Sequence, residues 1–502
     1  MAKRNRCMRT KYLVGHVVGW IGPLVAIYSA ICPCASAAWS TLVNNGSPTN
    51  RVDVVFLGDG YTQANLAAGL YTSHVQNYLG HMFASPNFLS DPFPRYSKFF
   101  NVHKIDVMSL ESGADDPSPN GIFRNTALDA TYDTFGIDRL LTINESKANT
   151  ILNDNLAGSG ITADVRLVTV NDVQYGGSGG TWAVFAGGNS EARDIALHEL
   201  SHAFSATEDE YVTNSGPFLG PEPAEVNVTK DPTGLKWSRW LGFDDPRAPY
   251  LDIGAFEGAA NYPTGIYRPS LDSKMRTLER PFNAVVREKS ILDVYQHVDP
   301  LDAWLGNGAT IAGGTLWVDA VDPNVIWVDW YVDNQLVAAN HGESFDLADF
   351  DFGAGTYNVR AHAYDEVVKH ASDGTLLDLV RLNLGALQQD VVWTVDFNPP
   401  LAGDYNLNGE VDAADYSVWK SSFGSSGQLA ADGNDDGFVN AADYTMWRNN
   451  VGAGAGGANA ANVPISEPTA AGLFTTALIG GWLLVRARRA ARGAVFSNCC
   501  RV

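Results

Sequence analysis

Two histidines and a glutamate lie close together near the middle of the chain, in the segment His198-Glu199-Leu200-Ser201-His202. If this segment is helical, both imidazoles face one side, one turn apart, and can reach one Zn²⁺ ion at about 2.0–2.1 Å. Glu199 is then placed to take a proton from a water on the metal and to deliver one to a leaving amine. Bound zinc lowers the pKa of that water and polarises a carbonyl group. The segment therefore predicts a hydrolytic zinc site with His198 and His202 as ligands and Glu199 as catalytic base.

Such a site needs a third protein ligand, and three acidic residues follow His202 closely: Glu208, Asp209 and Glu210. After a turn near residues 205–207, any of these carboxylates could return to the metal, and spacing alone does not choose among them. Neutral imidazoles with one hard carboxylate suit zinc and leave a position open for water and substrate. The alternative interpretation is a solvated amphipathic helix with incidental histidines.

Residues 50–301 must supply the elements that position this motif. Short apolar runs at 52–57, 99–107 and 165–170 predict strands, and a glycine-rich loop follows at 175–180. A helix is expected to begin after Ser190 as N-cap and to continue through His202. The sequence thus predicts an α/β domain over residues 50–301. The loop at 176–180 is either mobile or leads into an edge strand that pairs with a peptide substrate.

Residues 198–211, together with 50–62, 100–103, 109–113, 126–129 and 175–177, resemble the IgA-peptidase (igalysin) family of metzincin zinc metallopeptidases. That resemblance implies a metzincin-like α/β zinc peptidase fold, Asp209 as the third zinc ligand and Glu210 as the reserve choice. It also implies that Met275, within residues 273–276, forms a methionine turn beneath the metal without ligating it. The group that stabilises a developing oxyanion stays open, with Tyr211 and Tyr267 as candidates.

An internal repeat with a period of 28 residues occupies residues 404–452. Each copy places oxygen-bearing residues at positions 1, 3, 5, 9 and 12 of a loop, with glycine at position 6 and a backbone carbonyl available at position 7, which is the EF-hand layout for Ca²⁺. The alternative is a polar turn repeat without metal. The predicted calcium residues are Asp404, Asn406, Asn408, Glu410, Asp412 and Asp415 in the first copy and Asp432, Asn434, Asp436, Phe438, Asn440 and Asp443 in the second.

The two copies, each followed by a short apolar helix, resemble a type I dockerin module, a small α-helical unit that two structural Ca²⁺ ions would fold. The resemblance implies a cohesin-like scaffold or cell-surface partner, often among polysaccharide-degrading machinery. Alanines at 413–414 and 441–442 stand where Ser or Thr often mediates recognition, so a cohesin partner stays open.

The remaining segments predict export and a further domain. Residues 1–37 have the basic start, apolar run and small-residue site of a signal peptide. Residues 306–397 predict a small β-sandwich, 453–464 a linker, and 465–492 either a PEP-CTERM-like sorting signal or a C-terminal membrane segment. All five cysteines lie in the terminal segments, which excludes a thiolate metal site from the body of the chain.

Together these features predict an exported zinc-dependent endopeptidase with one catalytic Zn²⁺, a polypeptide substrate and a calcium-dependent docking module. The net charge of −22 argues against a nucleic-acid partner, which requires a basic surface. The expected location is the extracellular space or outer surface of a Gram-negative-type bacterium, with membrane contact only through the terminal targeting segments. Two alternatives remain: an inactive surface adhesion or scaffold protein, and a dockerin protein associated with polysaccharide degradation.

Overall fold

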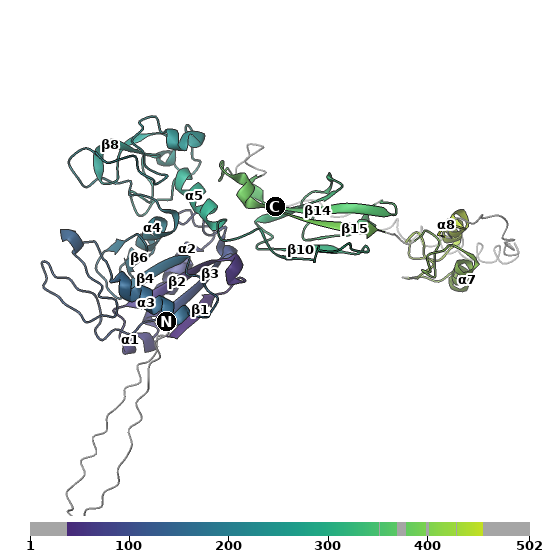
Figure 1. Cartoon of the computed structure of the whole chain (residues 1–502), viewed down its shortest axis with the longest axis horizontal. Coiled ribbons are helices and arrows are strands. Elements are labelled where there is room, and N and C mark those ends of the chain that lie inside the picture. Colours follow the sequence, from purple (N-terminus) through teal and green to yellow (C-terminus); the bar gives the residue numbers. More distant parts are fainter. Residues whose placement is uncertain (1–37, 351, 369–377, 398–400, 428, 455–502) are drawn as a thin grey trace, which may run out of the picture. The chain divides into compact units, whose positions relative to one another are not determined.

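The computed structural model describes residues 38–350, 352–368, 378–397, 401–427 and 429–454 (Figure 1). The predicted signal peptide at 1–37, the tail at 465–492 and all of the linker beyond 454 lie outside the described residues. The chain divides into two compact units. The first comprises residues up to 306 with 316–345 and 359–392, and the second comprises 307–315, 346–358 and the residues from 393 onward.

A six-stranded sheet forms the centre of the first unit, with strand order β1-β3-β2-β4-β6-β5. The strands are β1 (Ala38–Val43), β2 (Val52–Asp59), β3 (Phe100–Asp106), β4 (Val165–Val170), β5 (Gly177–Ser178) and β6 (Ala183–Ala186). The four inner strands pair in parallel, and the two edge strands are antiparallel to their neighbours. Every residue of β2 is buried, as expected for a strand covered on both faces.

Helices cover both faces of this sheet. The helices of this unit are α1 (Gln63–Ala67), α2 (Leu70–Met82), α3 (Glu145–Leu156), α4 (Ala192–Ser205) and α5 (Ala284–Val294), of which α5 packs against α4. Leu152 of α3 packs in one apolar cluster with Val55 and Leu57 of β2. Tyr78 of α2 instead packs on Phe56, with ring centroids 5.8 Å apart. Because neighbouring strand residues point to opposite faces, α3 and α2 lie on opposite sides of the sheet.

Helix α4 carries the histidine motif and lies against β4, β5 and β6. It begins at Ala192 with Glu191 in the N-cap position, and Glu191 makes no side-chain cap hydrogen bond. The prediction that Ser190 is the N-cap was therefore wrong by one residue. The helix ends at Ala206, whose φ of 48° lies in the left-handed region. This conformation reverses the chain, so residues 207–209 return along the helix.

The rest of the first unit contains the hairpin β7 (Phe256–Ala259) and β8 (Tyr262–Arg268), and two further sheets follow this hairpin in the chain. One has the order β13-β10-β9 and the other β12-β11-β14-β15. Their strands are β9 (Leu301–Trp304), β10 (Leu316–Ala320), β11 (Ile326–Val332), β12 (Gln335–Ala338), β13 (Ser344–Phe345), β14 (Gly355–Asp365) and β15 (Gln388–Phe397). Trp330 of β11 stacks on Phe345 of β13 with centroids 5.2 Å apart, so side chains of the two sheets meet.

The second unit contains two short helices, α7 (Ala413–Ser422) and α8 (Ala441–Asn450). Asp412 and Asn440 cap their N-termini through side-chain hydrogen bonds. A small core joins the two repeats and includes Tyr405, Val411, Trp419, Ala431, Val439 and Trp447.

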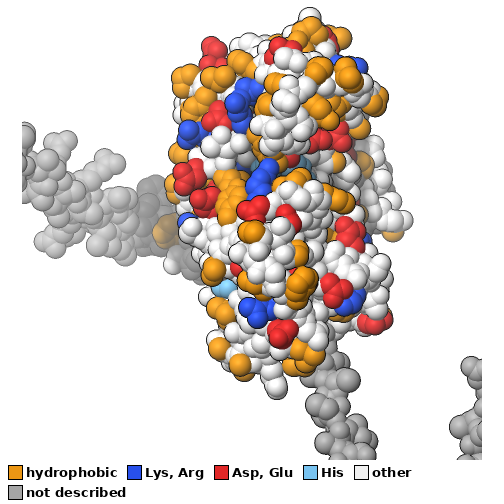
Figure 2. All heavy atoms as spheres, turned by 90° about the vertical axis from the view of Figure 1, so that its left-hand side faces the viewer, with side chains coloured by type: hydrophobic (Ala, Val, Ile, Leu, Met, Phe, Trp, Pro, Cys, Tyr) orange, Lys and Arg blue, Asp and Glu red, His pale blue; other side chains and the backbone are white. Residues whose placement is uncertain are grey.

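The prediction of a multidomain chain that mixes helices with several sheets, including a sheet-rich part, is confirmed. Among the described helices, none combines the length and the apolar character needed to span a bilayer. On the face drawn in Figure 2, acidic, basic and apolar side chains are interspersed.

Candidate metal and catalytic site

Three side-chain atoms converge at the C-terminal end of α4. His198 Nε2 lies 3.1 Å from Asp209 Oδ1, His202 Nε2 lies 3.2 Å from the same oxygen, and the two Nε2 atoms are 3.2 Å apart. Three donors around one tetrahedral Zn²⁺ at about 2.05 Å would be separated by about 3.3 Å. The residues present therefore fit a zinc ion in donor type and in spacing.

Backbone carbonyls hold both imidazoles in this orientation. His198 Nδ1 donates to the carbonyl oxygen of Lys274 at 3.1 Å, and His202 Nδ1 donates to that of Thr207 at 2.6 Å. Because a carbonyl can only accept, the proton of each neutral ring is on Nδ1, which leaves the Nε2 lone pair free to bind a metal. The reversal at Ala206 is what brings the Thr207 carbonyl back to His202.

Of the three acidic residues after the helix, Asp209 is the one whose carboxylate reaches both histidines. Glu208 instead accepts a hydrogen bond from the backbone N–H of Asp209. The fully buried Glu210 accepts hydrogen bonds from the side chains of Asn227, Ser273 and Asn283. Asp209 thus faces the two histidines, whereas Glu210 is bonded to side chains within the fold.

The charges of this cluster are strongly coupled. Burial acts to raise the pKa of Asp209, but hydrogen bonds and attraction from the two histidines outweigh it and lower that pKa. Burial acts to lower the pKa of His202, but Asp209 outweighs it and raises that pKa to about 9. A metal ion that binds here must therefore displace a proton from the imidazole.

Glu199 lies beside the cluster and is almost fully buried. Burial raises the pKa of its carboxyl group, although His198 and His202 oppose the rise. A Cβ atom added at Gly177 of β5 would lie 2.9 Å from Glu199 Oε1, so the lack of a side chain at that position leaves room for this carboxylate. Glu199 is thus a buried carboxylate beside the two histidines, a kind of group that can accept a proton.

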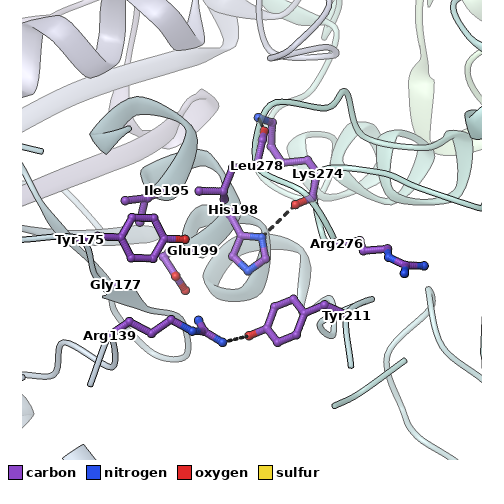
Figure 3. Close-up of a pocket in the computed structure, with 10 residues that line it drawn as sticks. All are labelled: Arg139, Tyr175, Gly177, Ile195, His198, Glu199, Tyr211, Lys274, Arg276 and Leu278. Carbon is purple, nitrogen blue, oxygen red and sulfur yellow. Dashed lines mark hydrogen bonds between the residues drawn. The ribbon is translucent and has the colours of Figure 1, made fainter. Parts of the chain in front are cut away.

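Two adjoining cavities of about 220 and 410 Å³ open beside Glu199 and His198. Figure 3 shows the smaller cavity, which is lined by Arg139, Tyr175, Gly177, Ile195, His198, Glu199, Tyr211, Lys274, Arg276 and Leu278. The larger cavity also contains His202 and Asp209. Tyr211 lines both cavities, whereas Tyr267 lines neither and pairs its backbone with Thr229.

Arg139 also lines both cavities, and our reading of the sequence did not identify it. It lies in the long connection between β3 and α3, where no motif or periodic pattern marks it. The loop at 176–180, for which the sequence leaves open a mobile loop or an edge strand that pairs with a peptide substrate, contains the short edge strand β5. On its outer side, however, Gly177 forms a bridge with Leu140, so a pairing peptide could reach only the exposed Gly179 and Gly180.

Met275 is completely buried and lies against the segment that carries Asp209. Its carbonyl oxygen accepts the N–H of Glu210 at 2.8 Å, and Thr207 Oγ1 lies 3.8 Å from its sulfur. None of these contacts involves a metal-facing atom, which is compatible with the predicted supporting role.

The two repeats of the second unit form loops with matching hydrogen bonds. Asp404 and Asp432, at loop position 1, accept the N–H groups of Gly409 and Gly437, both at 2.8 Å. Asp415 and Asp443, at position 12, are buried and also accept loop N–H groups. Of the remaining predicted residues, Asn406, Asn408, Asn434 and Asp436 accept loop N–H groups, Asp412 and Asn440 cap the helices, and Glu410 and Phe438 occupy position 7.

Two protein-family models match parts of the chain. Residues 41–253 match the family model for IgA Peptidase M64, and residues 402–452 match that for the Dockerin type I domain. The predicted resemblance to the IgA-peptidase family and to a type I dockerin is thereby confirmed. The first match contains residues 198–211 and ends before Met275, and the second spans both repeats.

No curated protein sequence matches the chain significantly. Among solved structures, one similar chain is the Bacteroides ovatus mixed-linkage glucan utilization locus (MLGUL) SGBP-B in complex with mixed-linkage heptasaccharide, at 19% identity and a TM-score of 0.13. The similarity covers 20% of this chain and 21% of that chain, so the chain spans about a fifth of its length. A likeness of this size carries no argument about function.

Proposed function

We propose that this chain is an exported zinc-dependent endopeptidase in which His198, His202 and Asp209 bind the zinc and Glu199 is the catalytic base. The observation that carries the proposal is the convergence of three donor atoms within 3.2 Å of one another beside a buried glutamate. Two imidazoles with one carboxylate are a common donor set for catalytic zinc and leave a position open. The match to IgA Peptidase M64 supports a peptide bond as the target.

In this proposal, Glu199 transfers protons and the backbone carbonyls beside His198 and His202 orient the metal ligands. When bound, zinc would lower the pKa of a water molecule and polarise the scissile carbonyl. Glu199 takes the proton from the attacking water and passes it to the nitrogen of the leaving amine. Its raised pKa brings its affinity for a proton closer to the working pH, which favours both transfers. The carbonyls of Lys274 and Thr207 keep the imidazoles from rotating during this cycle.

For the second unit, we assign two Ca²⁺ ions to the repeat loops at residues 404–415 and 432–443. A dockerin module implies binding to a cohesin-like partner, and Ca²⁺ would hold the loops in the binding conformation. Dockerin modules occur in extracellular and cell-surface proteins, which supports export. The signal peptide at 1–37, the sorting tail at 465–492, the domain limits at 301 and 306 and the β-sandwich over 306–397 remain part of this proposal.

Metal analysis with casein digestion tests the peptidase. We expect one zinc per chain in the wild type and in Glu199→Gln, and digestion reduced by on the order of 10²–10⁴-fold in the variant because proton transfer is lost. Glu145→Gln removes an exposed carboxylate at the start of α3 and serves as the matched control with wild-type digestion. Equal digestion by wild type and Glu199→Gln would refute the catalytic assignment.

The dockerin match favours one alternative, a docking or scaffold protein whose peptidase segment is inactive. The dockerin match equally favours the other alternative, a dockerin protein associated with polysaccharide degradation. Calcium-dependent binding to a cohesin, combined with no digestion by zinc-loaded wild type, would support these alternatives over the peptidase.

A further inference from the structure

Arg139 presents a cation to the active-site cavity without a carboxylate partner among the described residues. Its side chain is exposed, and its guanidinium lines both cavities beside Glu199. Nη2 donates to the Tyr211 hydroxyl at 3.2 Å, and the guanidinium carbon lies 5.2 Å from the Tyr211 ring centroid. Figure 3 shows this guanidinium pointing toward Tyr211, in the space below Glu199 and His198. Its direct partner is therefore a neutral phenol.

This arrangement differs from that of most arginines with defined partners in the same unit. Eight of them pair with carboxylates: Arg51, Arg95, Arg239, Arg247, Arg280, Arg287, Arg360 and Arg381. The chain has a net charge of −22, so carboxylates are abundant. An arginine held by a phenol at the catalytic cavity keeps most of its five N–H donors available for another anion.

The other charged groups of the smaller cavity leave it cationic in net character. The Lys274 ammonium is buried and neutralised by Asp194. Arg276 lies at the opposite wall, extends away from His198 in Figure 3 and donates to the carbonyl oxygen of Leu271. Glu199 is the one carboxylate in this lining, and its charge is attracted by His198 and His202 as well as by Arg139. The apolar walls, Ile195 and Leu278, would accommodate the stem of an entering side chain.

We propose that Arg139 binds a carboxylate of the substrate in this cavity, so that the enzyme prefers peptides with a carboxylate next to the bond that it cleaves. This inference rests on the proposed peptidase function. A planar guanidinium can donate two parallel hydrogen bonds to a carboxylate. The hydrogen bond to the Tyr211 hydroxyl holds the Arg139 guanidinium in place. The carboxylate is either that of an Asp or Glu side chain or that of the peptide C-terminus, and the two sources share the same chemistry.

A hydrogen-bonded ion pair of this kind corresponds to a selectivity of about 10- to 100-fold. The zinc-loaded full-length chain is first given a library of natural peptides, and mass spectrometry identifies the cleaved bonds. We expect enrichment of Asp and Glu, or of free C-termini, immediately next to those bonds. Two pairs of matched peptides then give kcat/KM for the two sources of the carboxylate. One pair has Glu or Gln at the enriched position, and the other has a free acid or an amide at the C-terminus.

Arg139→Gln should lower kcat/KM about 10- to 100-fold for the carboxylate-bearing peptide and less than about threefold for its Gln or amide counterpart. Arg193→Gln removes an exposed arginine of α4 that lines neither cavity and is the matched control. Zinc content and thermal unfolding of each variant establish that the site and the fold are intact.

Two outcomes would overturn the inference and leave the peptidase in place. One is cleavage of the library with no carboxylate preference. The other is an equal loss on both matched peptides in Arg139→Gln, which would mean that the arginine acts on a feature common to all substrates. If the zinc-loaded wild type cleaves nothing in the library, the proposed function fails together with the inference.

Discussion

Lys274 connects His198 to an earlier turn of the helix that carries it. The backbone carbonyl of Lys274 accepts the His198 Nδ1 proton at 3.1 Å, while its buried ammonium group contacts Asp194, four residues before His198. The same ammonium donates to the carbonyl oxygen of Leu278 at 2.6 Å. Burial lowers the pKa of Lys274, although the attraction of Asp194 opposes this. One residue thus fixes the orientation of a proposed zinc ligand from both its main chain and its side chain.

Replacing Lys274 with Met should weaken zinc binding by about 10- to 100-fold, because the carbonyl that orients His198 loses its anchor. The fold should also lose about 3 kcal/mol, because among the described residues Asp194 would keep only the more distant His81, at 3.5 Å, as a cationic partner. Zinc titration and denaturant unfolding measure the two effects. Lys289→Met, which removes a partly exposed ion pair with Asp293, is the control and should cost less than about 1 kcal/mol. Unchanged zinc affinity in Lys274→Met would show that the carbonyl needs no anchor.

Asp209 and Glu210 are neighbours, but their substitution should affect different properties. Asp209→Asn should abolish stoichiometric zinc binding, since its carboxylate faces the two histidines. Glu210→Gln should destabilise the fold by about 2 kcal/mol, because an amide cannot accept all the hydrogen bonds that Asn227, Ser273 and Asn283 donate. Metal analysis and thermal unfolding on both variants separate the roles. Zinc loss in Glu210→Gln without destabilisation would reverse the assignment.

The motif helix could be predicted because its chemistry depends on local spacing. Residues four apart share one face of a helix wherever that helix lies in the fold, so His198 and His202 could be paired from the sequence. The repeat loops were predictable for the same reason. The choice of Asp209 over its acidic neighbours did not follow from spacing and came only from the family resemblance, because it depends on the backbone reversal at Ala206. Left-handed turns are usually marked by glycine, and none is present there.

Arg139 shows a different limit of sequence reasoning. It reaches the cavity from the connection between β3 and α3, whose course depends on tertiary contacts such as the bridge between Leu140 and Gly177. No local pattern encodes such a course. The N-cap of α4 was misplaced because Ser190 has the preferred residue type, whereas the helix begins one residue later at a position that lacks a side-chain cap.

Substituting Ala206 with Gly should keep or raise stability. An alanine in the left-handed conformation destabilises the folded state by about 1–2 kcal/mol, and glycine removes this strain. Glycine also makes the unfolded chain more flexible, which cancels about 0.5–1 kcal/mol of that gain. The expected change is a gain of up to about 1 kcal/mol, measured by denaturant unfolding with zinc content unchanged. Ala203→Gly, within the helical part of α4, should instead cost about 1 kcal/mol. A loss in Ala206→Gly as large as that in Ala203→Gly would mean that the reversal carries no strain.

His297 should make stability depend on pH. Its Nδ1 lies 3.3 Å from Asp164 Oδ1, and the hydrogen bond with Asp164 raises the pKa of His297 although partial burial opposes the rise. A raised folded-state pKa means that the stabilisation is complete below the unfolded value of about 6.5 and is lost as pH rises through the folded value. His297→Gln should therefore cost more at pH 5.5 than at pH 9. Because the ring is partly exposed, the difference should stay below about 1 kcal/mol. Equal costs at the two pH values in denaturant unfolding would contradict the ion pair.

Trp419 and Trp447 link the two dockerin repeats reciprocally. Trp419 Nε1 donates to the carbonyl oxygen of Asn440 at 2.9 Å, and Trp447 Nε1 donates to that of Asp412 at 2.7 Å. Each indole thus donates to the residue at position 9 of the other repeat's loop, which also caps that repeat's helix, so ordering one loop should favour order in the other. Trp419→Phe and Trp447→Phe should each weaken calcium binding at both loops and not at one loop alone. The summed loss of binding free energy over the two sites should be about 1 kcal/mol.

Calcium titration of the full chain by calorimetry measures this coupling as the difference between the two binding steps. Tyr416→Phe is the matched control, because its ring packs in the same core while its hydroxyl makes no hydrogen bond among the described residues. If one tryptophan substitution weakens a single calcium site and leaves the other at wild-type affinity, the loops are independent. The reciprocal bonds would then stabilise the core without coupling the two sites, since coupling requires that each ion respond to the state of the other loop.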